Sequence, residues 1–358
     1  MKILNGKQRM MFRRLALSLI RYCLVLVAGL FFVSLPAFAD NRIVSSNTFL
    51  PLSTPAHDIY YLALFTLTLT GCVFVVVGSL IFYAVVKYRA RKTDPEHEPA
   101  QVYGSAQVEM AWTVIPIILI VVLFLTTARI IFAIQNAPQP KRDLKVTVVG
   151  HQFWWEFRYP EYGIVTANEL HIPLSTKQNP DTTYLTLLSA DVDHSFWVPE
   201  LGGKTDLIPN HPNEMWMDPE KAGVYYGQCA QFCGLEHSLM LIRVYVDTPG
   251  QFAAWVKNQQ KPAVEDADVA AGRQIFESEA CANCHTIHGT SAKGTYGPDL
   301  THLMSRTTIA AGAADNTPEN LHKWIKDPAL FKPGAHMPAM QLSDQQIDQV
   351  VAYLTTLH

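Results

Sequence analysis

The chain has 358 residues, enough for about two or three domains. Hydrophobic residues make up 49% and charged residues only 16%, whereas an average soluble domain is about a quarter charged, so some segments are unusually apolar. The net charge of −3 argues against a protein that binds nucleic acid through a basic surface, and the apolar content argues against a disordered chain. Six cysteines are too few for a disulfide scaffold, so their spacing carries the information.

The first 39 residues have the pattern of an export signal. Basic residues precede an apolar run over residues 15–33, and Ala37-Phe38-Ala39 supplies the small residues of a cleavage site. An uncleaved transmembrane anchor is the alternative. Because Arg21 interrupts the apolar run, we expect a cleaved signal peptide over residues 1–39.

Two further apolar stretches predict a transmembrane hairpin within residues 40–137, with helices over about 59–86 and 110–134. Each is long enough to cross the hydrocarbon core, where only a helix satisfies its own backbone groups. The connecting loop carries Lys87, Arg89, Arg91 and Lys92. Basic residues in short loops stay in the cytoplasm, so both flanking segments are expected outside it.

Residues 141–258 predict a β-domain. Short β-branched or apolar runs occur at Val146–Val149, Tyr184–Leu188 and Met240–Val246, and Gly, Pro and Asp separate them. Short strands with turn residues between them indicate a sandwich or a small barrel.

The segment from Cys229 to Met240 contains two thiols, one imidazole (His237) and one thioether, and His194 offers a second imidazole. Thiolate, thioether and imidazole together favour copper. A Cys229–Cys233 disulfide or a zinc site are alternatives, and Met240 alone would suit a core position. A disulfide would not explain the spacing of His237 and Met240 from the cysteines. A zinc site would not explain Met240. A mononuclear blue-copper site needs one thiolate, whereas two thiolates can bridge two copper ions.

Here the sequence resembles subunit II of the haem–copper cytochrome c oxidases. The resemblance rests on Cys-x-x-x-Cys-x-x-x-His-x-x-Met at Cys229–Met240, and on His194 followed by Val198-Pro199 and Lys204-Thr205-Asp206-x-x-Pro209. It covers the hairpin and the β-domain, and implies a cupredoxin-like fold with the dinuclear copper centre CuA. The implied ligands are bridging Cys229 and Cys233, terminal His194, His237 and Met240, and the main-chain carbonyl of Gln231.

Gln231 departs from the family, which most often has Glu at this position. In the family that carboxylate also binds a magnesium ion shared with subunit I. The copper contact uses the main chain and should be retained. A magnesium contact would have to use the neutral amide oxygen of Gln231 in place of a carboxylate.

The aromatic segment around Phe153 and Trp155 is a second match to the family. Aromatic residues in a β-domain are usually core, and that is the structural reading of Trp155. In the family, a Trp at the position of Phe153 receives electrons from soluble cytochrome c. Its replacement by Phe153 suggests a different electron entry route.

Glu109 lies at the cytoplasmic start of the second membrane helix. An acidic residue there complements the helix macrodipole. The family resemblance offers a second interpretation, in which Glu109 marks the mouth of a proton-uptake channel into subunit I.

Cys281-Ala282-Asn283-Cys284-His285 is the attachment pattern of a c-type haem, and residues 263–358 are predicted to be an α-helical cytochrome c domain. The two thiols would form thioethers and His285 would be the proximal iron ligand. A thioredoxin-like pair is the alternative, but no βαβ pattern surrounds the motif. Met337, Met340 and His336 are candidates for the sixth ligand. The loop resembles that of class I cytochromes c, in which the Met followed by Pro is the ligand, which selects Met337.

The helical domain has two further features. Thr317-Pro318 should start one helix, and Ser343 with Gln346 should form the capping box of another, whose core face is Ile347, Val350, Val351 and Leu354. From residue 263 onward there are 6 basic and 11 acidic residues, so the domain is acidic. Such a surface either recruits a basic donor or is simply solvated.

Together these features predict an electron-transfer subunit of a terminal respiratory oxidase in a bacterial plasma membrane, with both soluble domains on the periplasmic side. Electrons would pass from a donor cytochrome or respiratory complex through haem c and CuA to subunit I, where oxygen is reduced; subunit III is a further expected partner. A CuA-containing nitric oxide reductase and a periplasmic copper chaperone are the alternatives. A quinol oxidase subunit II is disfavoured because it lacks the copper ligands, which are complete here.

Overall fold

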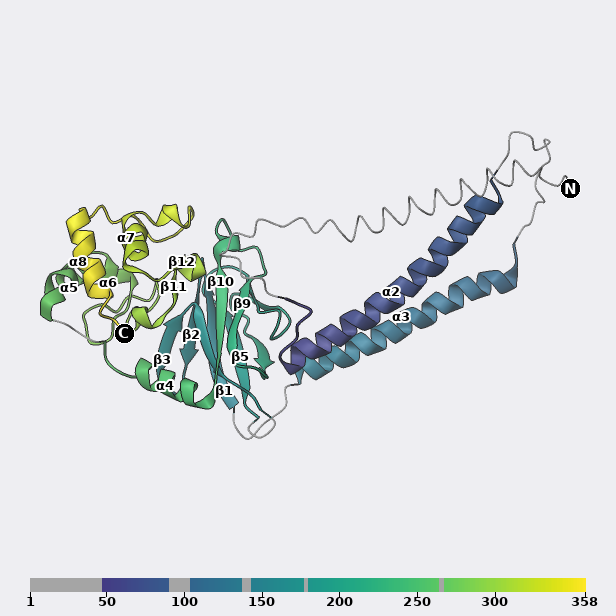
Figure 1. The fold of residues 1–358 in the computed structure, drawn as a ribbon, viewed down its shortest axis with the longest axis horizontal. Helices are drawn as coiled ribbons and strands as arrows, with labels where there is room; N and C mark the ends of the chain where they lie inside the picture. The colour runs from purple at the N-terminus through teal and green to yellow at the C-terminus, as the bar shows by residue number, and fades with distance from the viewer. Residues whose placement is uncertain (1–46, 90–103, 137–142, 177–179, 264–266) are drawn as a thin grey trace, which may run out of the picture. The chain divides into compact units, whose positions relative to one another are not determined.

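The structure is a computed structural model that describes residues 47–89, 104–136, 143–176, 180–263 and 267–358. The predicted signal peptide lies outside the described residues, as do Arg91 and Lys92 of the basic loop. The described elements are two long helices, a β-domain and a helical C-terminal region, which are labelled in Figure 1.

Helices α2 (Thr54–Lys87) and α3 (Ala106–Gln135) are long and apolar enough to cross a membrane. This confirms the two predicted apolar helices. Most of their side chains are exposed, as expected of surfaces that face lipid. Helix α2 begins before the predicted Ile59 because Pro55 fits the first turn of a helix.

The start of α2 is bonded to the β-domain through Asp218. One carboxylate oxygen of Asp218 accepts hydrogen bonds from the Ser53 hydroxyl and the Thr54 amide, both at 2.8 Å. The other accepts from the Thr54 hydroxyl at 2.6 Å. At the end of α3, the Trp216 indole donates to the carbonyl of Ile134 at 2.5 Å. Both long helices are therefore bonded to strand β8 (Asn213–Met217) or to the residue that follows it.

The β-domain contains two five-stranded sheets, with strand orders β3-β2-β1-β5-β8 and β4-β10-β9-β6-β7. The strands are β1 (Asp143–His151), β2 (Trp154–Tyr159), β3 (Ile164–Ala167), β4 (Glu169–Pro173), β5 (Thr182–Ser189), β6 (His194–Trp197), β7 (Thr205–Leu207), β8 (Asn213–Met217), β9 (Gly223–Cys229) and β10 (Leu241–Asp247). The predicted runs at Val146, Tyr184 and Met240 lie in or directly before β1, β5 and β10. The β1–β5 and β4–β10 pairs are parallel.

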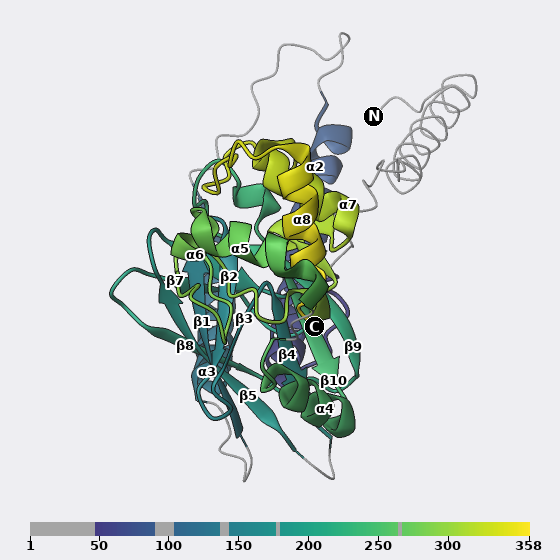
Figure 2. The ribbon, with the colours of Figure 1, turned by 90° about the vertical axis from the view of Figure 1, so that its left-hand side faces the viewer.

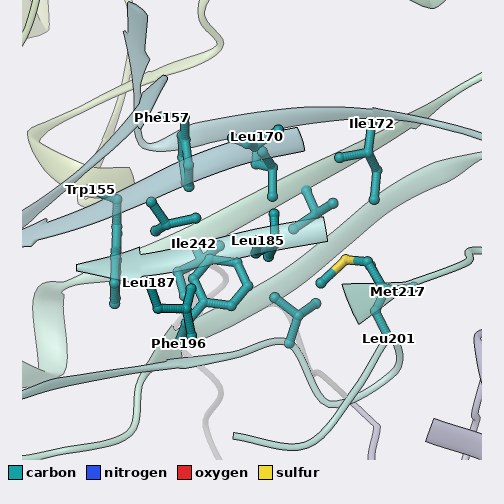
Figure 3. Packing of buried hydrophobic residues seen from close by; sticks show 14 of the residues in the cluster. Trp155, Phe157, Leu170, Ile172, Leu185, Leu187, Phe196, Leu201, Met217 and Ile242 are labelled. Carbon is teal, nitrogen blue, oxygen red and sulfur yellow. The ribbon is translucent and has the colours of Figure 1, made fainter. Parts of the chain in front are cut away.

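The core lies between the two sheets (Figure 3). In β10, inward residues alternate with half-buried ones, the pattern of a strand with one face on the core. Trp155, Phe157 and Phe196 are fully buried, and the ring of Phe196 contacts each of the other two edge to face. This arrangement is the predicted sandwich, with a cupredoxin-like fold.

Helix α4 (Pro249–Gln259) follows β10. Thr248 and Gln251 form a capping box at its start. The ring of Trp255 stacks on His171, with centroids 4.5 Å apart, which packs α4 against β4.

The C-terminal region is helical, and Figure 2 shows α5, α7 and α8 grouped together. Its elements are α5 (Ala270–Ser278), α6 (Cys281–Cys284), α7 (Pro318–Lys326), α8 (Asp344–Leu354) and the short strands β11 (Thr308–Ile309) and β12 (Ala314–Asp315). The predicted start of α7 at Thr317-Pro318 and the capping box of α8 are confirmed. Ile347, Val350, Val351 and Leu354 are buried, as predicted.

Gly272 of α5 lies against the main chain of α8. A Cβ atom at this position would be 1.9 Å from the carbonyl oxygen of Gln349. Only glycine allows the two helices to approach this closely.

Candidate redox site

The predicted copper ligands come from separate elements that the second sheet brings together. His194 begins β6, and Cys229 ends β9. Because Phe196 pairs with Cys229 across these strands, the register sets His194 beside the cysteine loop. His237 lies in a short 3₁₀ turn (His237–Leu239), and Met240 precedes β10.

The donor atoms of this group face one another. Sγ of Cys229 and Sγ of Cys233 are 3.9 Å apart. The other distances are 4.0 Å from Cys229 Sγ to His194 Nδ1, 3.8 Å from Cys233 Sγ to His237 Nδ1, 3.9 Å from Cys233 Sγ to Met240 Sδ and 3.2 Å from Cys229 Sγ to the Gln231 carbonyl oxygen. Thiolates, imidazoles and a thioether at such separations suit copper.

Both cysteines are buried and free, so the structure has no Cys229–Cys233 disulfide. The hydrogen bond between the two thiols lowers the pKa of Cys229, while the same neighbour and burial raise the pKa of Cys233. A bound cation would favour the thiolate form of both cysteines.

Asp191 and Gly150 orient His194, and the sequence analysis missed both. The His194 ring donates from Nε2 to Asp191 at 2.7 Å, which turns Nδ1 toward Cys229. Burial lowers the pKa of His194, but its hydrogen bonds to Asp191 and Cys229 raise it overall. A Cβ atom at Gly150 would lie 2.8 Å from the ring. The position of Asp191, three residues before the candidate ligand His194, could have indicated from the sequence that it orients this ligand.

Gln231 points its side chain to solvent, and only its carbonyl faces Cys229. Trp155 is fully buried in the core, as in its structural reading, and its ring contacts His194 edge to face at 6.0 Å. Phe153 is also buried, with the ring of His336 beside it at 5.4 Å between centroids.

The predicted haem residues line one cavity. Its lining includes Cys281, Cys284, His285 and Met337, with Met340 also present. Nδ1 of His285 lies 2.8 Å from the carbonyl oxygen of Pro298, which leaves Nε2 available to a metal. Burial lowers the pKa of His285, which favours the neutral imidazole that a metal ligand requires.

Two observations test whether a haem fits this cavity. A Cβ atom at Gly297 would lie 2.5 Å from the His285 ring, so Gly297 makes room for the imidazole. Arg306 lines the cavity and is buried, and its Nε has no hydrogen-bond partner among the described residues. A buried cation with an unpaired donor suits a carboxylate of the ligand.

Glu109 lies in the first turn of α3, as predicted, where its charge complements the helix dipole. Glu169 and Lys332, which bond the two soluble domains to each other, were not found from the sequence. Their partners lie far away in the chain, so no local pattern marks them.

Comparisons with known proteins agree with this arrangement. The family description "Cytochrome C oxidase subunit II, transmembrane domain" matches residues 44–130, "Cytochrome C oxidase subunit II, periplasmic domain" matches residues 144–246, and "Cytochrome c" matches residues 269–358.

Two relatives are similar over most of the chain. Cytochrome c oxidase subunit 2 of Alkalihalophilus pseudofirmus is 36% identical over 314 residues, which cover 86% of this chain and 89% of the relative. Cytochrome c oxidase subunit 2 of Bacillus sp. (strain PS3) is 37% identical over 290 residues, covering 75% and 80%. A solved periplasmic domain of subunit II from Bradyrhizobium japonicum is 31% identical with a TM-score of 0.31, and covers 34% of this chain and 96% of that chain. The chain therefore belongs to the subunit II family of cytochrome c oxidases and carries a C-terminal cytochrome c domain.

Proposed function

We propose that this subunit passes electrons from an external donor through a covalently attached haem c and a dinuclear CuA centre to the oxygen-reducing centre of subunit I. Both groups supply one-electron redox chemistry when bound. The observation that carries the proposal is the gathering of six copper-type donors beside a cavity that holds a complete haem-attachment motif.

At the copper site, Cys229 and Cys233 would bridge two ions through their sulfurs. His194 and His237 would each complete one side, with Met240 and the Gln231 carbonyl as weak ligands. Asp191 holds the His194 ring in the required tautomer.

At the haem site, Cys281 and Cys284 would form the thioethers, and His285 and Met337 would be the axial ligands. The Pro298 carbonyl orients His285. Arg306 would pair with a carboxylate of the haem. Met ligation raises the iron reduction potential, which suits an electron carrier.

The proposal includes the organisation of the chain. Residues 1–39 would be a cleaved signal peptide, 40–137 the membrane hairpin, 141–258 the CuA domain and 263–358 the haem domain. The soluble domains would lie in the periplasm of a bacterial plasma membrane, in a complex with subunits I and III. Residues 332–337 lie over Phe153, which supports entry of electrons through haem c rather than directly at this position.

The purified complex tests the relay through Cys284→Ala. The variant should lack covalently attached haem, seen as the loss of haem staining on a denaturing gel. Its CuA centre should no longer be reduced by the protein donor but should still be reduced by a small dye mediator. Unchanged reduction by the protein donor would contradict the proposed route. The rates at which the unmodified complex consumes oxygen and nitric oxide are measured separately. The gas that is consumed faster is the electron acceptor.

A further inference from the structure

Building on the proposed function, we propose that the haem domain is held in one fixed position against the copper-ligand loops, with Glu169 and Lys332 as the positioning residues. A tethered mobile domain would have to find its docking site again after each release, although the tether raises its local concentration. A fixed domain needs no such step. Two buried charged side chains of different domains carry this inference.

The first is the Glu169 contact, formed by Glu169, Thr307 and Thr308. Glu169 starts β4 and is only 2% exposed. Its carboxylate accepts hydrogen bonds from the Thr307 amide at 2.9 Å and hydroxyl at 2.7 Å, and from the Thr308 amide at 3.0 Å and hydroxyl at 2.9 Å. A buried carboxylate is costly unless it is hydrogen-bonded, and these donors all belong to the haem domain. The β-domain therefore carries a charge whose bonds are completed by the haem domain.

Two side chains of β10 extend this contact. Arg243 donates to the hydroxyl of Thr308 at 2.9 Å. The hydroxyls of Tyr245 and Thr307 are 2.6 Å apart. The threonine pair is thus bonded to two adjacent strands, which fixes its direction as well as its position.

The second is the Lys332 contact, formed by Lys332, Gly334, Phe153 and Glu236. Lys332 is only 3% exposed, and its ammonium donates to the main-chain carbonyl of Phe153 at 2.8 Å. Two residues on, the amide of Gly334 donates to the carboxylate of Glu236 at 2.6 Å. Glu236 is also buried. The turn that leads to Met337 is therefore bonded to the loop that contains His237.

The two contacts meet at the haem cavity. Thr308 and Lys332 line it from the haem domain, and Phe153 and Asn168 line it from the β-domain. One wall of the haem cavity therefore belongs to the domain that carries the copper ligands. A mobile haem domain would lose this wall each time it moved away.

The Lys332 contact also continues to a copper ligand. Gln152, the neighbour of Phe153, donates from its side-chain amide to the carbonyl of Cys233 at 2.5 Å. A short path of covalent and hydrogen bonds thus runs from Lys332 through Gln152 to Cys233. Displacing the 332–334 turn would break this path.

The test uses the intact oxidase complex with the double variant Glu169→Gln, Lys332→Met. Glu319→Gln with Lys326→Met is the matched control, because both side chains are exposed on α7 of the same domain. Hydrogen exchange is measured at the amides of Thr307, Thr308 and Gly334. Electron transfer from haem c to CuA is measured after photoreduction at several solvent viscosities.

Loss of one hydrogen bond to a buried charge lowers a docking constant by about tenfold or more. The double variant should therefore exchange these amides about tenfold faster, and its transfer should become slower and dependent on viscosity. The variant should still contain both its haem and its copper, as their absorption spectra would show. The control and the unmodified complex should show protected amides and transfer independent of viscosity.

The fixed position would be overturned if the double variant kept the amide protection and the electron-transfer rate of the unmodified complex. It would also be overturned if electron transfer in the unmodified complex depended on viscosity. If the double variant loses its metal centres, Thr308→Val is used instead, since it removes one donor to Glu169 and keeps the shape. If haem c does not reduce CuA at all in the unmodified complex, the proposed relay is wrong, and amide exchange still decides whether the domain is fixed.

Discussion

The ring of His194 donates a hydrogen bond to Asp191 at 2.7 Å, and this bond directs the opposite nitrogen of the ring at the sulfur of Cys229. Orientation of a ligand by an acid outside the ligand set typically contributes ten- to a hundredfold in metal affinity. The Asp191 carboxylate also accepts from the amide of Gln152 at 2.6 Å, so it links two loops of the site.

Asp191→Ala should therefore weaken copper retention by about ten- to a hundredfold. The measurement is copper content after competition with a chelator. Asp193→Ala is the matched control, because Asp193 is an exposed neighbour with the same charge. Equal copper loss in both variants would show that Asp191 does not orient the ligand.

Cys229→Ser should abolish the mixed-valence copper signal in electron paramagnetic resonance, because an oxygen cannot replace a bridging thiolate. Cys72→Ser, on the exposed surface of α2, should leave the signal intact. A spectrum that persists in Cys229→Ser would count against bridging sulfurs, and a solitary cupric signal in the unmodified protein would contradict the dinuclear centre.

Met337→Leu should lower the reduction potential of haem c by on the order of 100 mV, since axial ligands set haem potentials over a range of about 0.8 V. Met340→Leu is the internal control, because both side chains line the same cavity. A redox titration of the haem absorption separates them. A drop confined to Met340→Leu would assign the iron to the other methionine.

Lys332→Met should change how stability depends on pH. Burial lowers the pKa of Lys332 to about 8, below the ordinary value of 10.5. Between these values the unfolded chain binds more protons than the folded one, so the stability of the unmodified protein should rise with pH relative to the variant. The full shift in the pKa of Lys332 corresponds to a change in the free energy of unfolding of at most about 3 kcal/mol.

Unfolding of the full chain, followed from pH 7 to 11, tests this expectation about Lys332. The exposed Lys326→Met serves as the control and should show no such divergence. Parallel curves for Lys332→Met and the unmodified protein would mean that the ammonium is not buried in solution.

Glu109→Gln separates the two interpretations of this residue. As a proton-uptake residue, Glu109 is needed for fast turnover, and the variant should consume oxygen several-fold more slowly. As an acid that only complements the helix dipole, it would contribute about 0.3–1 kcal/mol of stability and leave turnover unchanged. Oxygen consumption and thermal unfolding of the purified complex are measured together.

The features that could be predicted from the sequence are local in the chain. The apolar runs of α2 and α3, the capping box at Ser343 and the spacing from Cys229 to Met240 each lie within one segment. The motif even placed His194 correctly beside the cysteine loop, although the strand register that achieves this could not be derived from it.

The contacts between domains could not be predicted, because their partners are far apart in the chain. Glu169 bonds to Thr307 across 138 residues and Lys332 to Phe153 across 179. A lysine or glutamate in a loop is usually solvated, so composition marks neither as buried. These buried contacts form an interface between the two domains, and hydrogen exchange tests whether it is permanent.

The close crossing at Gly272 has a consequence for how this domain matures. The segment that leads into Cys281 and Cys284 packs on α8, which follows both cysteines in the chain. During synthesis, both thiols emerge from the ribosome before their supporting helix exists. The packing of α5 on α8 can therefore form only after both thiols have been synthesised.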